Sequence, residues 1–121
     1  MSGSEPQDRP LSLSEHAALL WVLRAVPDRR DAELLYMQSL VAAVQGGPLT
    51  MRELAIPSAC AAAPIPDGPL PVRAVAYDDD GAPIGELLVW VADGYLSAIE
   101  YAWYTDSAPA ELPAPCQLRQ E

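Results

Sequence analysis

The stretch IGELLVWVADGYLSAIEYAWY, residues 84–104, decides the fold of this chain. It consists of two long apolar runs that meet at Asp93-Gly94. An Asp-Gly pair between β-branched and aromatic residues is the strongest short-range signal for a β-hairpin, because glycine adopts the positive φ of a tight turn freely and aspartate tolerates it. The sequence therefore predicts two antiparallel strands, residues 84–92 and 95–104.

Two further strands are predicted before this hairpin. Residues 72–77 form a short apolar run that ends at an acidic turn, so they extend the hairpin into an antiparallel meander. Residues 49–56 begin with the alternation of a strand and lose it at Glu53, which predicts a weak edge strand. Residues 57–71 contain five prolines and are predicted to form a long surface loop.

Two helices are predicted ahead of the strands. Ser12 and Glu15 have the spacing of a capping box, and the apolar residues that follow recur at helical spacing, which predicts a helix over residues 13–26. A second helix is predicted over residues 32–45, with Asp31 as its N-cap. Its expected buried face carries Leu34, Met37, Val41 and Val44.

The connection between these helices is short, so they are expected to form an antiparallel pair. We expect an α+β fold in which this pair packs on one face of a three- to four-stranded antiparallel β-meander. At 121 residues the chain has room for one core. A single domain is predicted over residues 12–104, between a flexible N-terminal tail, residues 1–11, and an extended C-terminal tail, residues 105–121.

The charge of the chain limits the classes of partner that it is expected to bind. Seven arginines and no lysines stand against seventeen acidic residues, and the net charge of −10 disfavours binding to nucleic acid or to anionic membranes. No apolar run approaches the length that spans a bilayer, and residues 1–10 lack the apolar segment of a signal peptide. A cytoplasmic protein is expected, with Cys60 and Cys116 as free thiols.

The pairing of the hairpin decides which side chains share a face of the sheet. If the pairing continues unbroken from Ala92 opposite Tyr95, one face is small and aliphatic, with Glu100 as its charged exception, and receives the helices. The other face would carry the candidate binding residues Arg73, Trp90, Tyr95, Tyr101 and Trp103. An exposed aromatic face of this kind marks a binding surface; alternatively, the loop and the tail cover it as a second core.

Glu86 and Glu100 are weak candidates for catalysis. A pairing shifted by one residue, with a bulge at Gly94, would place the two carboxylates opposite each other, and the repulsion would raise one pKa as acid–base catalysis requires. Otherwise Glu86 is expected to pair with Arg73, and Glu100 to accept a hydrogen bond at the sheet margin. The acidic turn 78–81 and the lone His16 lack ligands at metal spacing, so neither a metal nor a cofactor is expected.

Three motifs of the hairpin resemble a group of small uncharacterised actinobacterial proteins. They are GELLVWV at residues 85–91, DGYLS at 93–97 and IEY at 99–101. The resemblance covers residues 70–118 and implies a fold but no activity. Some distant members carry a Cys-Gly-Cys-like segment in mid-chain, where this chain has only Cys60.

Two classes of function follow from these features. The first is an acidic binding module that engages a protein partner, or a second copy of itself, through the aromatic face; an immunity-type protein that neutralises a basic toxin is one example. The second is a small hydrolase or lyase that uses Glu86 and Glu100 as a paired-carboxylate site. Burial of the aromatic residues inside the monomer would count against the first class, and separated carboxylates would count against the second.

Overall fold

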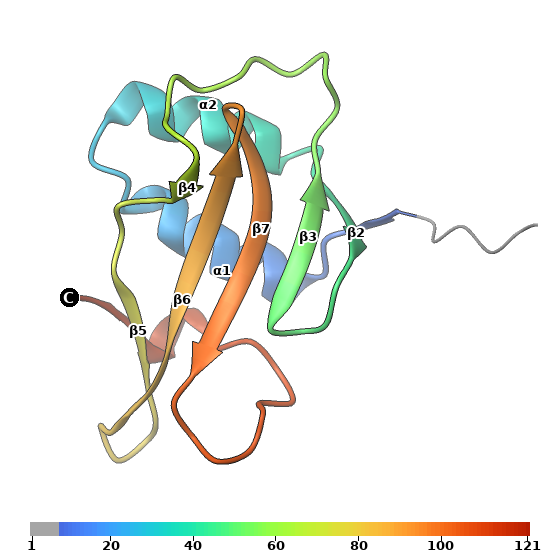
Figure 1. Cartoon of the computed structure of the whole chain (residues 1–121). Helices are drawn as coiled ribbons and strands as arrows, with labels where there is room; N and C mark the ends of the chain where they lie inside the picture. Colours follow the sequence, from blue (N-terminus) through green and yellow to red (C-terminus); the bar gives the residue numbers. More distant parts are fainter. Residues whose placement is uncertain (1–7) are drawn as a thin grey trace, which may run out of the picture.

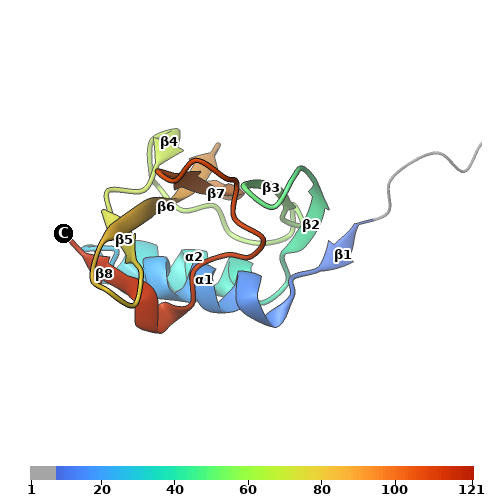
Figure 2. The same cartoon turned by 90° about the horizontal axis from the view of Figure 1, so that it is seen from below.

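The computed structural model describes residues 8–121 and has two layers, with two helices packed on one face of an eight-stranded antiparallel sheet (Figures 1 and 2). The helices are α1 (Leu13–Arg24) and α2 (Arg29–Ser39). The strands are β1 (Arg9–Pro10), β2 (Ala43–Gly46), β3 (Met51–Ala55), β4 (Gly68–Pro69), β5 (Ala74–Tyr77), β6 (Pro83–Ala92), β7 (Tyr95–Trp103) and β8 (Leu118–Gln120). Their order in the sheet is β1-β2-β3-β7-β6-β5-β8, and β4 pairs with β6.

The predicted α+β class is confirmed, but the sheet is larger than the expected three to four strands. Four strands are additional. β2 forms partly where helix was predicted, and β1, β4 and β8 contain only two or three residues each, too few to show an alternating pattern in sequence. Neither helix is long and apolar enough to cross a membrane, in the chain from residue 8 onward.

The first helix begins as predicted. The Ser12 side chain accepts a hydrogen bond from the Glu15 amide at 3.1 Å, and the Ser12 amide donates to the Glu15 carboxylate at 2.8 Å. This capping box satisfies two amides that the first helical turn leaves without partners. The helix ends at Arg24 rather than at residue 26, one turn before Pro27 can disrupt it.

The predicted bounds of the second helix are wrong at both ends. Asp28 rather than Asp31 is the N-cap, and its carboxylate accepts a hydrogen bond from the Asp31 amide at 2.9 Å. The helix ends at Ser39, and residues predicted to continue it form β2, which pairs with β1 and β3. In that strand Val44 lies in the core opposite Leu54, so sheet pairing replaces the last helical turn.

Both predicted tails contribute to the sheet. In the N-terminal one, Arg9–Pro10 pairs with β2; residues 1–7 of that tail lie outside the residues that the structure describes. In the C-terminal one, a 3₁₀ turn (Pro115–Gln117) leads into β8, which pairs with β5. Leu112 and Leu118 are buried in the core and hold this segment against the rest of the fold.

The β6–β7 hairpin has the predicted turn but a different register. Asp93 and Gly94 have φ values of 54° and 85°, and Ala92 lies opposite Tyr95. Val91 then pairs with Leu96, whereas Trp90 pairs with Ala98, so Ser97 is an extra residue in β7. This β-bulge means that both predicted registers, the unbroken one and the one shifted at Gly94, are wrong.

The bulge exchanges the faces of the rest of β7. Ile99 and Tyr101 pair with Val89 and Leu87 and are buried in the core beneath the helices. Glu100 pairs with Leu88 and points to the opposite face. One extra residue reverses the alternation of every residue beyond it, which is why aliphatic and aromatic side chains replace the predicted Glu100 on the core face.

One buried polar side chain links the helices to the hairpin turn. Gln38 of α2 is fully buried, and its amide group donates to the Gly94 carbonyl at 2.9 Å and to the Ala61 carbonyl at 3.0 Å. Its carbonyl oxygen accepts a hydrogen bond from the Leu96 amide at 2.9 Å. These three bonds fix the turn and the proline-containing loop, which Figure 1 shows crossing the top of the molecule before β4.

Candidate functional site

The predicted aromatic face does not assemble as one surface. Trp90 lies on the outer face of the sheet, away from the helices, and its indole nitrogen donates to the Glu100 carboxylate at 2.9 Å. Tyr101 is only 3% exposed, and burial raises the pKa of its hydroxyl. A Cβ atom at Gly85 would collide with the Tyr101 ring, so glycine at this position lets the ring cross the strand.

The other predicted binding residues are dispersed around the sheet. The Tyr95 hydroxyl donates to the Cys60 carbonyl at 3.0 Å, so the loop engages it. Trp103 lies at the far end of β7 and is 40% exposed. Arg73 is exposed before β5, at the opposite side of β6 from Trp103. The prediction that these side chains share one continuous face with Tyr101 is therefore wrong.

Glu86 and Glu100 lie on the same face but do not oppose each other. Glu86 pairs with Ala102, one row away from Glu100. Its carboxylate lies 3.9 Å from the Arg73 guanidinium and 3.4 Å from the Tyr104 hydroxyl. The predicted alternative to a catalytic pair, in which Glu86 meets Arg73 and Glu100 accepts a hydrogen bond, is the arrangement observed.

The two thiols are not joined in a disulfide, and no metal-ligand cluster is found among the described residues. Cys60 and Cys116 are free, as predicted. Within residues 8–121, no three His, Cys, Asp or Glu side chains are arranged to hold a metal ion.

Among residues 8–121, the largest group of exposed apolar side chains lies on the helix side of the molecule. Tyr36, Met37, Leu40 and Val41 are between 46% and 61% exposed. They are exposed because α2 turns Leu35 and the polar residues Gln38 and Ser39 toward the core. Residues 36, 37 and 40 share a face of a helix, so these side chains form one patch at the carboxyl end of α2.

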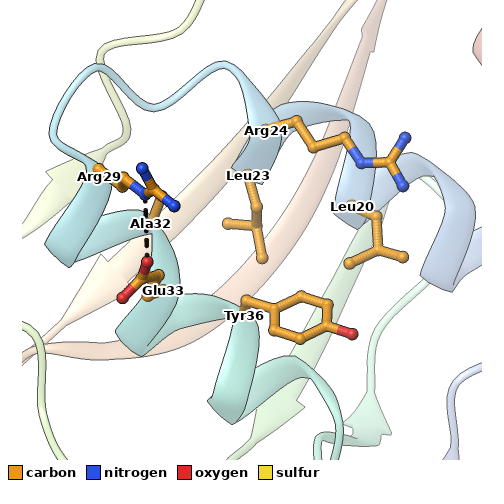
Figure 3. Close-up of a pocket in the computed structure, with 7 residues that line it drawn as sticks. All are labelled: Leu20, Leu23, Arg24, Arg29, Ala32, Glu33 and Tyr36. Carbon is orange, nitrogen blue, oxygen red and sulfur yellow. Dashed lines mark hydrogen bonds and ion pairs between the residues drawn. The ribbon is translucent and has the colours of Figure 1, made fainter.

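A groove between the two helices adjoins this patch (Figure 3). It has a volume of about 210 Å³, and Leu20 and Leu23 of α1 face Ala32 and Tyr36 of α2 across it. Figure 3 shows the Tyr36 ring reaching from α2 toward Leu20. We define the helix surface as the residues Leu20, Tyr36, Met37, Leu40 and Val41.

Charged side chains border the groove on two sides. Arg29 and Glu33 form an ion pair at one end, with 3.3 Å between Nε and Oε1, and the Arg24 guanidinium lies beside Leu20 (Figure 3). Both members of the ion pair are highly exposed, so it adds little to stability. Charged side chains thus form a polar margin around the apolar groove, as is common at protein–protein interfaces.

The helix surface was not predicted from sequence, because Met37 and Val41 were assigned to the buried face of the second helix. Gln38 and Ser39 take the buried positions instead, and polar residues there give no hydrophobic signal. The usable signal is the run Leu34-Leu35-Tyr36-Met37, because four consecutive residues point around the whole circumference of a helix and cannot all lie in one buried stripe.

Comparisons with protein-family models, with curated proteins and with solved structures gave no match to this chain. The resemblance to small actinobacterial proteins stays a prediction.

Proposed function

We propose that this protein is a binding module that engages a basic protein partner through the helix surface. The observation that carries the proposal is the group of four large apolar side chains at residues 36–41, each about half exposed or more. A contiguous exposed apolar patch with a polar margin is typical of a protein-binding site. An immunity protein bound to a basic toxin is one arrangement of this kind.

The apolar residues supply affinity. Full burial of an exposed leucine or methionine side chain contributes roughly 1.5–3 kcal/mol. Met37 and Leu40 are 61% and 53% exposed, so covering each would contribute about half of that amount toward the entropy lost on association. Tyr36 adds a large side chain with few rotatable bonds, of a type enriched among residues that dominate binding energy.

The net charge of the molecule favours a basic protein as the partner. A net charge of −10 attracts a basic protein at long range and repels a second copy of the same chain. Residues 13–41 contain four carboxylates and three arginines, so nearly all of the excess charge lies outside the helix pair. An apolar segment of a basic partner can therefore contact the helix surface without meeting a cluster of charges of either sign.

The outer face of the sheet is less suited to binding a protein partner. Its largest aromatic residue, Trp90, is partly buried and hydrogen-bonded to Glu100, and the same face carries the charged pair Arg73 and Glu86. Burying this face would require desolvation of these charges, which costs free energy unless the partner replaces their interactions.

A double substitution tests the proposal. Met37→Glu with Leu40→Glu places two charges in the centre of the patch, whereas Trp103→Glu places one at the exposed end of β7. Each tagged variant would be incubated with lysate of the native host, and captured proteins would be compared with those of the wild type. We expect a basic protein to be retained by the wild type and by Trp103→Glu, and lost from the double variant.

Circular dichroism and thermal unfolding confirm that each variant is folded before capture is compared. Retention of the same partner by the folded double variant, or its loss only from Trp103→Glu, would contradict the proposal. Sedimentation of the pure protein provides a second test: a wild-type dimer that the double variant dissociates would identify the helix surface as a contact between copies and overturn the proposed partner.

A further inference from the structure

We infer that a second cavity, formed by the α1–α2 connection and the proline loop, receives an arginine side chain of the basic partner. This cavity has a volume of about 350 Å³ and is larger than the groove between the helices. The inference rests on the proposed function, because it takes the cation to belong to a protein. It specifies one side chain of the partner, an arginine, which the helix surface alone does not identify.

The walls of the cavity are apolar and already in place. Its rings come from Pro27 on the helix connection and from Pro64, Pro66, Pro69 and Pro71 on the loop. Proline restricts the backbone of the loop, so little conformational entropy is lost when a ligand binds.

The loop is also held to the hairpin by hydrogen bonds at several points. The Ala63 amide donates to the Gly94 carbonyl at 2.8 Å, and the Leu70 amide donates to the Val89 carbonyl at 2.8 Å. The Asp93 amide donates to the Asp67 carboxylate at 2.8 Å. A cavity fixed in this way is preorganised rather than a transient gap between loops.

All of the charged residues that line this cavity are acidic. They are Asp28, Asp31 and Asp67. Among residues 8–121, no arginine forms an ion pair with any of them. Asp28 and Asp67 each use one carboxylate oxygen, Oδ1, to accept a backbone hydrogen bond, which orients the carboxylate and leaves Oδ2 available to a ligand.

An arginine side chain matches both properties of this cavity. Its methylene groups can lie against proline rings, while its planar guanidinium carries five N–H donors that can be shared among separate carboxylates. The surrounding net charge of −10 strengthens the attraction for a cation. Asp31 and Ala32 are consecutive in α2 and line the cavity and the groove respectively, so one partner can contact both.

A short peptide tests the cavity without the partner. The probe is acetyl-Gly-Arg-Gly-amide, titrated into the full chain labelled with ¹⁵N, and its reference is the same peptide with neutral citrulline in place of arginine. We expect amide shifts confined to residues 26–32 and 63–71, with affinity at least tenfold weaker for the citrulline peptide.

Two matched variants separate the cavity from the general negative charge. Asp31→Asn with Asp67→Asn keeps the shape of the side chains and removes two charges, and it should weaken arginine-peptide binding at least tenfold. Asp79→Asn with Asp80→Asn removes the same charge from an exposed turn outside the cavity and should leave the affinity within twofold.

Equal binding of the citrulline peptide, shifts centred on the acidic turn, equal weakening by both double variants, or no shifts at all would each overturn the inference. The Met37→Glu, Leu40→Glu variant should bind the peptide like the wild type, because it does not alter the cavity. If the cavity binds the arginine peptide but the protein captures no partner from lysate, that result contradicts the proposed function alone. Failure of the cavity inference and failure of the proposed function are therefore distinguishable.

Discussion

Gln38 shows how one side chain can connect both layers of the fold. Leucine in its place would be similar in size but could neither donate to the Gly94 and Ala61 carbonyls nor accept from the Leu96 amide. A buried polar group that loses its partner costs roughly 1–3 kcal/mol. We predict that Gln38→Leu lowers the free energy of unfolding, measured by urea denaturation, by about 3 kcal/mol.

Gln45→Leu is the matched control for this substitution, because Gln45 is exposed on β2. It should change the free energy of unfolding by less than about 0.5 kcal/mol. Similar effects of the two substitutions would show that the hydrogen bonds of Gln38 do not hold the turn.

Glu15 is the second buried polar residue with a defined structural role. It is 2% exposed, and the Arg9 guanidinium donates to both of its carboxylate oxygens at 2.8 Å, while Arg52 of β3 lies 3.1 Å away. The hydrogen bonds from Arg9 lower the pKa of Glu15 from 4.5 to about 2, although burial acts in the opposite direction. Further lowering comes from the Ser12 amide.

This pKa predicts a loss of stability in acid. Because the pKa is lower in the folded than in the unfolded chain, the stabilisation is fully present above about pH 4.5 and is lost as the pH falls toward 2. The shift corresponds to roughly 3 kcal/mol. We predict that the difference in unfolding free energy between the wild type and Glu15→Gln shrinks by about this amount between pH 5 and pH 2.

The control for the pH series is Glu53→Gln, which neutralises an exposed carboxylate on β3, next to Arg52. Its difference from the wild type should change much less over the same range. A difference for Glu15→Gln that is constant with pH would contradict the role assigned to its ion pairs.

At the scale of elements, the sequence was sufficient for the hairpin turn and for the start of the first helix. Asp93-Gly94 and the Ser12–Glu15 box are local signals, and local interactions produce the observed structure at both places. The bulge at Ser97 depends instead on packing across the sheet. Its trace in sequence is Glu100, which an unbroken register would have placed as a lone charge in the core.

The bounds of α2 and the additional strands could not be predicted for a related reason. The exchange of a last helical turn for β2 is decided by pairing with residues far along the chain, such as Val44 with Leu54. Strands as short as β1 and β8 exist only because a neighbouring strand is already in place. The candidate site could not be predicted for the same reason. The predicted aromatic face depended on an unbroken hairpin register, which the bulge changes, and the helix surface depends on which side of α2 packs against the sheet.

The bulge itself predicts losses of stability of different size for substitutions at two neighbouring aliphatic residues. Ile99 is fully buried and Leu88 lies on the outer face, whereas an unbroken register places both on the same face. We predict that Ile99→Ala lowers the unfolding free energy by roughly 2–5 kcal/mol and Leu88→Ala by about 1 kcal/mol. Urea denaturation of the two variants measures the difference, and equal losses would contradict the bulged register.

At the scale of the whole molecule, the two layers have different properties. The sheet carries charged residues on its outer face that are engaged with one another, whereas the helix layer leaves apolar side chains uncovered by any other part of residues 8–121. The cavity with its three aspartates lies at one end of the helix pair. These features together favour one binding side, formed by the helices and the adjoining loop.

Oxidative footprinting of the complex with the captured partner shows whether the partner covers the helix side or the sheet, because hydroxyl radicals modify exposed methionine, tyrosine and tryptophan side chains. Tyr36 and Met37 report on the helix surface, and Trp103 and Tyr104 report on the exposed end of β7. We predict that binding protects Tyr36 and Met37 severalfold and leaves Trp103 and Tyr104 unchanged. Protection of Trp103 and Tyr104 with unchanged oxidation of Tyr36 and Met37 would contradict binding through the helix surface.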